Sequence, residues 1–143
     1  MDNSSRLSDL QELVSRHGDT VLITQEYDLQ GSPQDTVTIY RDWSIGGLGF
    51  WIYYNLDGGD GSIFFYNSWG HRMRPSLSSS TLRRALGFDR ISDIEFVIKL
   101  YKSLASGRLI LITSRKLGVL SWDLLLDGRS IRLAYNENRG RRL

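Results

Sequence analysis

The apolar and polar residues of this chain repeat with two different periods. Between residues 4 and 17, Leu7, Leu10 and Val14 recur every three or four positions, which predicts a helix with one buried stripe. From residue 20 onward the period is close to two, as in strands that bury one face. Turns rich in glycine and aspartate, the first over 31–35, divide this region. The pattern predicts an antiparallel meander of four strands over 20–29, 36–43, 50–56 and 62–67.

Two helices are predicted after the meander. The first is short, covers 81–86 and is ended by a glycine. The second has the clearest signal in the chain, because Ser92 and Glu95 form a capping box at its start. Lys99 and Lys102 lie off its buried stripe. That stripe consists of Ile94, Val97, Ile98, Tyr101 and Leu104.

The chain continues with three more predicted strands. The apolar run over 108–113 is typical of a strand in the middle of a sheet. Strands over 119–126 and 129–135 flank Asp127-Gly128, which is a strong signal for a type I′ hairpin. We expect these strands to complete or extend the sheet that the meander begins.

Length and composition fit one folded unit. The 143 residues are 41% hydrophobic and 24% charged, as in ordinary globular proteins. We therefore expect a single α+β domain over 1–143, mainly antiparallel sheet, with a flexible basic tail at 136–143. The sequence contains no cysteine, which excludes disulfides and thiolate metal sites. The longest apolar run, 48–54, is too short to cross a bilayer, so we expect a cytoplasmic protein with no membrane partner.

The central predicted hairpin is apolar on both of its faces. Phe50, Ile52 and Tyr54 alternate with Trp51 and Tyr53, and the partner strand repeats this arrangement. Antiparallel sheets usually leave one face in water. One interpretation is a hairpin sandwiched between other elements, which the general tendency of such stripes to be buried favours. The other interpretation is an open aromatic face on which bases could stack.

Part of this hairpin resembles the RNP1 segment of RNA-recognition motifs, with matches at Gly47, Gly49, Phe50 and Tyr53. The segment lacks that motif's leading lysine or arginine, and Leu48 stands where the motif has an aromatic residue. The predicted element order also differs from the alternating order of that fold. We therefore do not assign the chain to this family.

Charge is divided unevenly along the chain. Residues 1–60 carry ten acidic and three basic side chains, a balance of −7, and residues 61–143 carry six acidic and fifteen basic, a balance of +9. Fifteen of the eighteen cations are arginines, whose guanidinium groups bind phosphate in a bidentate manner. A basic surface of this kind favours phosphate contacts that weaken as salt rises. The alternative interpretation is ordinary solvated charge with a few surface ion pairs to Asp89, Asp93 or Glu95.

The leading hypothesis is a non-enzymatic RNA-binding protein. Its phosphate contacts would come from Arg72, Arg74, Arg83, Arg84, Arg115 and Lys116. Its base contacts would come from Trp43, Trp51 and Trp69, which would stack on bases or cap them. The alternative is a protein-interaction module, such as an inhibitor, immunity or adaptor protein, that docks through the aromatic hairpin or the acidic N-terminal half. An exposed strand edge could also join two copies into a homodimer.

Signals for catalysis and for metal binding are weak. His17 and His71 are far apart and match no metal-binding or catalytic spacing, and His17 suits the end of a helix. The glycine- and aspartate-rich loop over 55–61 matches a calcium-binding loop only in part and is interpreted as a hairpin turn. We expect no enzymatic activity, no cofactor and no metal. A small hydrolase that depends on His71 is the third hypothesis.

Overall fold

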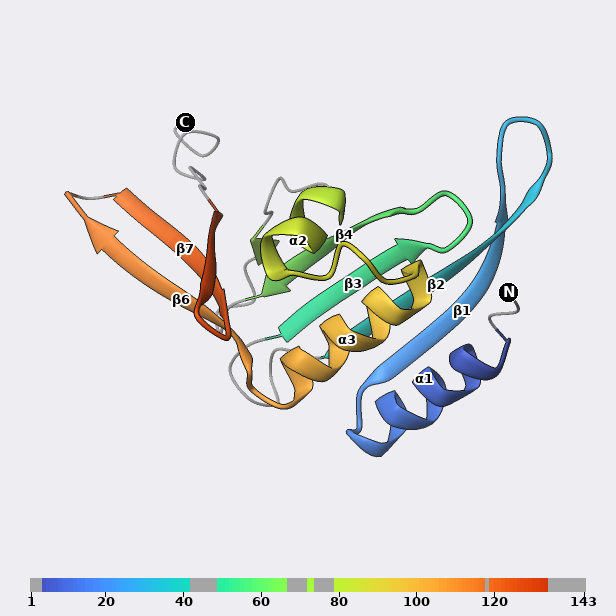
Figure 1. The fold of residues 1–143 in the computed structure, drawn as a ribbon, viewed down its shortest axis with the longest axis horizontal. Coiled ribbons are helices and arrows are strands. Elements are labelled where there is room, and N and C mark those ends of the chain that lie inside the picture. The colour runs from blue at the N-terminus through green and yellow to red at the C-terminus, as the bar shows by residue number, and fades with distance from the viewer. Residues whose placement is uncertain (1–3, 42–48, 67–71, 74–78, 118, 134–143) are drawn as a thin grey trace.

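The computed structural model describes residues 4–41, 49–66, 72–73, 79–117 and 119–133, and it has the predicted α+β architecture (Figure 1). Its elements in chain order are α1 (Ser4–Arg16), β1 (Thr20–Tyr27), β2 (Pro33–Arg41), β3 (Gly49–Asn55), β4 (Asp60–Tyr66), β5 (Arg72–Met73), α2 (Ser79–Leu86), α3 (Asp93–Ala105), β6 (Leu109–Lys116), β7 (Val119–Leu126) and β8 (Arg129–Leu133).

The first sheet is the predicted antiparallel meander, with the strand order β1-β2-β3-β4-β5. Strand β5 has only two residues and was not among the predicted strands. The prediction was wrong about the first turn, because β2 already begins at Pro33. The carboxylate of Asp28 accepts hydrogen bonds from the backbone N–H groups of Gln30 and Ser32, and Gly31 adopts a φ of +84°. An aspartate-centred turn therefore lies before the proline rather than after it.

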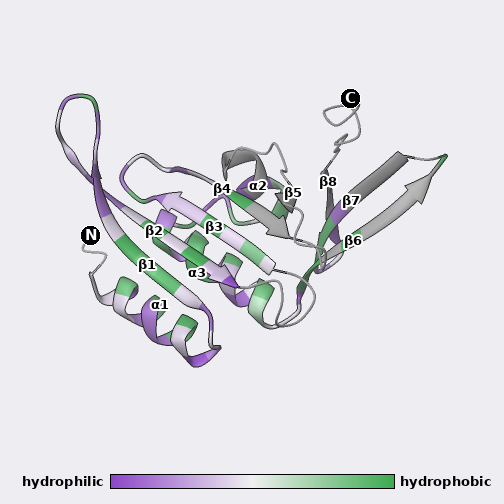
Figure 2. Cartoon of the chain, turned by 180° about the vertical axis from the view of Figure 1, so that it is seen from behind, coloured by the Kyte–Doolittle hydropathy of each residue, from purple (hydrophilic) through white to green (hydrophobic). Residues whose placement is uncertain are grey.

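Helices α1 and α3 cover one face of this sheet, as Figure 1 shows from the helix side and Figure 2 from the opposite side. Leu10 and Val14 of α1 are fully buried there, as the helical spacing predicts. Residues of β2, β3 and β4 supply the sheet side of this core, and α3 supplies the largest share of the helix side. The fully buried large side chains are Tyr54, Tyr101, Phe50, Phe96, Leu10, Ile39, Ile52, Leu100, Leu124, Val14 and Val37.

A network around Asp19 ties three elements together at one end of the sheet. Arg41, at the end of β2, donates two hydrogen bonds of 2.8 Å to the Asp19 carboxylate. The hydroxyl of Tyr101 in α3 donates a third, of 2.6 Å. Burial, and next the hydrogen bond to Asp19, raise the pKa of Tyr101, so the phenol remains a donor. The Asp19 side chain is only 4% exposed, so these donors take the place of water in stabilising its buried negative charge.

The start of α3 is fixed by Ser92, as the sequence predicts. Its hydroxyl oxygen accepts a hydrogen bond of 3.4 Å from the backbone N–H of Glu95. The Glu95 side chain instead reaches α1, where Arg6 donates to both of its oxygens, one of them at 2.9 Å. This bidentate pair joins the two helices and lowers the pKa of Glu95.

Replacing Glu95 with glutamine tests this link through pH. Because the folded pKa of Glu95 is lowered, its contribution to stability is present above the ordinary pKa of 4.5 and is lost as pH falls through the folded value. The wild type is therefore expected to exceed Glu95→Gln in free energy of unfolding at neutral pH, and the difference should shrink on acidification. Urea denaturation of both proteins across this range measures the difference. A difference that stays constant with pH would contradict the assignment.

The C-terminal strands form a second, separate antiparallel sheet with the order β6-β7-β8. The expectation that they extend the first sheet was therefore wrong, and so was the central placement of the 108–113 run. Strand β6 lies at an edge, where Ile110 is 44% and Ile112 is 41% exposed. The predicted hairpin turn is confirmed by the positive φ angles of Asp127 and Gly128, 49° and 83°. This sheet projects away from the first one in both overall views.

Candidate nucleic-acid interface

The labelled helices leave the opposite face of the first sheet uncovered (Figure 2), and two aromatic side chains of that face are exposed. Trp51 is 41% exposed and Tyr40, beside it on β2, is 38% exposed. The interpretation in which the hairpin is covered on both faces is therefore wrong at this point. The helices pack only against the face that carries Phe50, Ile52 and Tyr54, so the alternate residues are left outside.

Strand register brings the exposed rings together. Tyr40 pairs directly with Trp51, and their ring centroids lie 6.0 Å apart at an interplanar angle of 41°. Trp51 pairs on its other side with Phe64, so the backbone of β4 continues the row. Tyr53, the next residue on the same face of β3, donates a hydrogen bond of 3.0 Å to Glu26. Burial and then this bond raise its pKa, which keeps the phenol neutral.

The structure assigns Arg83 a set of internal contacts. Its guanidinium donates to Asp93 at 2.7 Å and to the backbone carbonyl of Ile91. It also lies over the ring of Phe96, 5.1 Å from the centroid, and its side chain is 15% exposed. These contacts join α2 to the start of α3. A phosphate contact by Arg83, which stays a prediction, would compete with them.

The other predicted site residues fall into two groups. Arg84, next to Arg83 on α2, is exposed and available to a ligand. For Arg72 on β5 and for Arg115 and Lys116 on β6, the structure describes the backbone position and not the side chain. Outside the described residues lie the three remaining predicted site residues, Trp43, Trp69 and Arg74. His71 and the tail over 136–143 also lie outside them. Within the described residues, the structure therefore brings Trp51 together with Tyr40 and places no predicted cation beside them.

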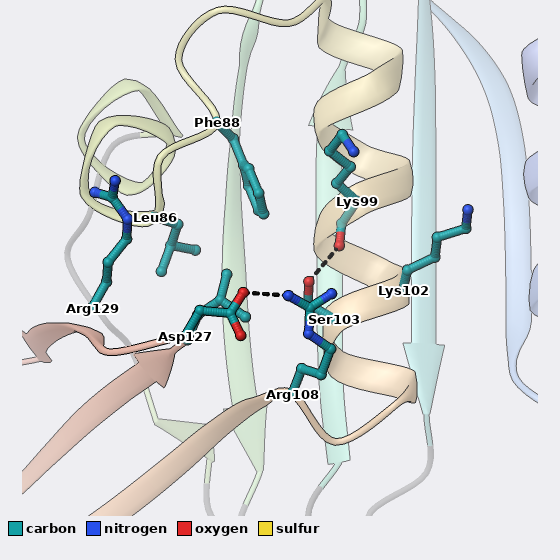
Figure 3. A pocket seen from close by; sticks show the side chains of 9 residues that line it. Leu86, Phe88, Lys99, Lys102, Ser103, Arg108, Asp127 and Arg129 are labelled. Carbon is teal, nitrogen blue, oxygen red and sulfur yellow. Dashed lines mark hydrogen bonds and ion pairs between the residues drawn. The ribbon is translucent and has the colours of Figure 1, made fainter.

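A pocket of about 350 Å³ lies between α3, the end of α2 and the second sheet (Figure 3). Of the described side chains that line it, four are cationic and one is acidic. These cations were not among the predicted site residues, although two of them, Lys99 and Lys102, were predicted to lie off the buried stripe of α3. The pocket is lined by Leu86, Phe88, Lys99, Lys102, Ser103, Arg108, Leu126, Asp127 and Arg129.

Three of the pocket cations have no acidic partner among the described residues. Arg108 forms an ion pair with Asp127 across the pocket, as Figure 3 shows. Within the described part of the chain, no carboxylate lies within ion-pair distance of Lys99, Lys102 or Arg129. The two lysines also help to lower the pKa of Glu95 on the same helix, after the larger effect of Arg6. The pocket therefore carries a surplus of positive charge.

Three further observations on the described residues concern a histidine, metal ligands and membrane spans. His17 follows α1, its Nδ1 lies 3.0 Å from the carbonyl oxygen of Leu13, and its ring packs edge-on against Tyr101. Among the described residues, no group of three or more histidine, aspartate or glutamate side chains is arranged to hold a metal ion. No helix in the described ranges is long and apolar enough to span a membrane.

Comparisons with protein-family models, with curated proteins and with solved structures give no match. Inference about function therefore depends on the two surfaces described above.

Proposed function

We propose that this chain is a non-enzymatic protein that binds single-stranded RNA through the open face of its first sheet. The observation that carries the proposal is the exposed pair of Tyr40 and Trp51 on adjacent strands. A flat sheet with neighbouring aromatic rings is a common platform for unpaired bases, because every base has a π-face that can stack. A cytoplasmic location, expected from the sequence, would give access to such a ligand.

The charge of the chain supports the same ligand class. The sequence has a net charge of +2 and an excess of nine positive charges in residues 61–143. Strand β5, at the edge of the first sheet, begins with Arg72, whose backbone pairs with Tyr66 on β4. A single strand that stacks on Trp51 and runs across the sheet toward β5 would meet positive charge there. The contact with phosphates would weaken as salt rises.

Replacing Trp51 with alanine is expected to weaken RNA binding by about tenfold, because one stacked base contributes roughly 1–3 kcal/mol. Trp51→Phe retains a ring and should recover most of the affinity. The measurement is fluorescence anisotropy of a labelled single-stranded oligonucleotide with a 5′-hydroxyl end, titrated at low and physiological salt. A duplex of the same sequence should bind more weakly, because its bases are already stacked on each other.

Tyr27→Ala is the matched control for this experiment. Tyr27 is an aromatic residue at the far end of β1, 66% exposed, and its position in β1 is on the other face of the sheet from Trp51. Its removal is expected to leave RNA affinity unchanged. Equal losses for Tyr27→Ala and Trp51→Ala would remove the aromatic face from the proposal. No binding even at low salt would reject RNA as the ligand, and a protein partner would then be sought.

A further inference from the structure

The cationic pocket is a separate feature from the aromatic face. Its lining comes from α2, α3 and the second sheet, and Figure 3 shows strands of the first sheet behind α3 and the lining side chains. Binding at this pocket is independent of RNA binding at Trp51. It can therefore succeed or fail independently of the function proposed above.

The pocket combines positive charge with an apolar wall. Figure 3 shows Leu86 and Phe88 on the α2 side of the pocket, facing α3, which carries Lys99 and Lys102. Phe88 is held in place by edge-on packing against Phe96, with ring centroids 6.2 Å apart. A volume of about 350 Å³ lies within the range of small-molecule sites and is much larger than a bare phosphate ion needs.

The positions of the cations follow from the local structure. Lys99 and Lys102 are three residues apart on α3, so they project from neighbouring parts of one helix face. Arg108 immediately precedes β6, and Arg129 is the first residue of β8. The guanidinium of Arg129 lies over Gly87, where a Cβ atom would be only 3.1 Å from its Cζ. The glycine that ends α2 thus leaves room for this arginine beside the pocket.

A second pocket, between α1 and α3, allows the charges that line the two pockets to be compared. Its volume is about 230 Å³ and its charges are of both signs. There Arg6 pairs with Asp9 at 2.7 Å and Arg16 pairs with Glu12 at 3.2 Å. Its carboxylates thus already have cationic partners. The pocket beside the second sheet shares Lys102 with this one but has the larger surplus of cations, four to one acidic residue against three to two.

We propose that this pocket binds a phosphomonoester of nucleotide size. The positive charge of Lys99, Lys102 and Arg129 would attract the phosphate, for which charge-assisted hydrogen bonds are the strongest available contacts. The wall formed by Leu86 and Phe88 would cover the organic part of the ligand. The group could belong to a free nucleotide or to the 5′-phosphorylated end of an RNA strand. Both present the same chemistry to the pocket.

The test measures binding of a nucleoside 5′-monophosphate by isothermal titration calorimetry, with the nucleoside and inorganic phosphate as companion probes. We expect the monophosphate to bind and the nucleoside to bind at least tenfold more weakly. The double variant Lys99→Gln/Lys102→Gln should lower the affinity for the monophosphate by about tenfold or more, because each charge-assisted hydrogen bond contributes substantially to binding. Arg16→Gln removes one positive charge from an exposed site outside the pocket and should change nothing.

Replacing Asp127 is expected to raise the affinity for the monophosphate, whereas the lysine variants lower it. It is the acidic residue among the described pocket residues, and it neutralises Arg108. Asp127→Asn should tighten binding of the monophosphate by about two- to fivefold, since it removes a repelling charge and releases the arginine. Asparagine accepts the φ of 49° at this position and favours the same hairpin turn, so the fold is preserved.

Competition with oligonucleotides identifies the source of the phosphate. Displacement of the nucleotide by a 5′-phosphorylated strand, but not by the same strand with a 5′-hydroxyl, would show that strand ends also bind. Failure of both strands would restrict the site to free nucleotides. Three results would overturn the proposal: equal binding of nucleoside and monophosphate, inorganic phosphate competing as well as the nucleotide, or no binding of the monophosphate at low salt.

Discussion

Arg41→Met is expected to lower the free energy of unfolding by about 3–5 kcal/mol, because it leaves the buried carboxylate of Asp19 without its cationic partner. Two hydrogen bonds of 2.8 Å are lost, and among the described residues the one from Tyr101 remains. The carboxylate, whose side chain is 4% exposed, cannot recover these bonds from water without opening the end of the sheet. Urea denaturation at neutral pH measures the effect.

Arg16→Met is the matched control, because it removes the same side chain from an ion pair in water. Arg16 and Glu12 lie one turn apart on α1, and their side chains are 66% and 76% exposed. Such a pair contributes about 0.5 kcal/mol or less. The double variant Arg41→Met/Asp19→Asn should be more stable than Arg41→Met alone, since it removes the unpaired charge. Similar losses for Arg41→Met and Arg16→Met would show that the network does not stabilise the fold.

Gly61→Ala is expected to cost about 3 kcal/mol or more, because the added methyl group has no space in the sheet. A Cβ atom at Gly61 would lie 2.2 Å from the carbonyl oxygen of Tyr53 and 2.8 Å from Cα of Tyr54. These are backbone atoms of the neighbouring strand, so β3 and β4 would have to separate. Chemical denaturation, or loss of soluble expression in a severe case, reports the effect.

Gly58→Ala provides the comparison within the same hairpin. Its Cβ atom would meet the side-chain ends of Asp60 and Asn55, at 3.0 Å and 3.3 Å, and these can move aside. We expect a loss of less than about 1 kcal/mol from this change. If the two glycine variants were equally stable, the close approach of β3 and β4 at Gly61 would be contradicted.

The local structure was largely predictable because it depends on short-range signals. The period-two alternation located β3 and β4, and Ser92 and the Asp127-Gly128 pair located a helix start and a hairpin turn. Placement of the C-terminal strands was not predictable in this way. An apolar run such as that of β6 is compatible with a central strand or with an edge strand, and only tertiary packing decides between them.

In the candidate sites, too, local patterns predicted which residues share a face, but tertiary packing decided which of them are exposed or lie close together. The face that carries Trp51 follows from alternation, but its exposure depends on which side of the sheet the helices cover. Asp93 was among the acids expected to pair with cations, but no local signal selects Arg83 as its partner, since ten positions and a helix end separate the two. The pocket cations come from α3, from the residue before β6 and from β8, and they line one pocket only because the second sheet is set against α3.

The links between α1 and α3 have a consequence for the order in which the protein forms during synthesis. Strands β1 to β4 pair with their neighbours in sequence, so the meander can assemble as the chain emerges. The partner of Arg6 in the first helix comes much later, since Glu95 is 89 positions away, and Asp19, which follows the helix, bonds Tyr101 over a separation of 82. Helix α1 is therefore synthesised before α3, and it can form its full set of contacts only after α3 has been made. Until then its apolar stripe is only partly covered, and this interval is when the nascent chain is most exposed to chaperones and to aggregation.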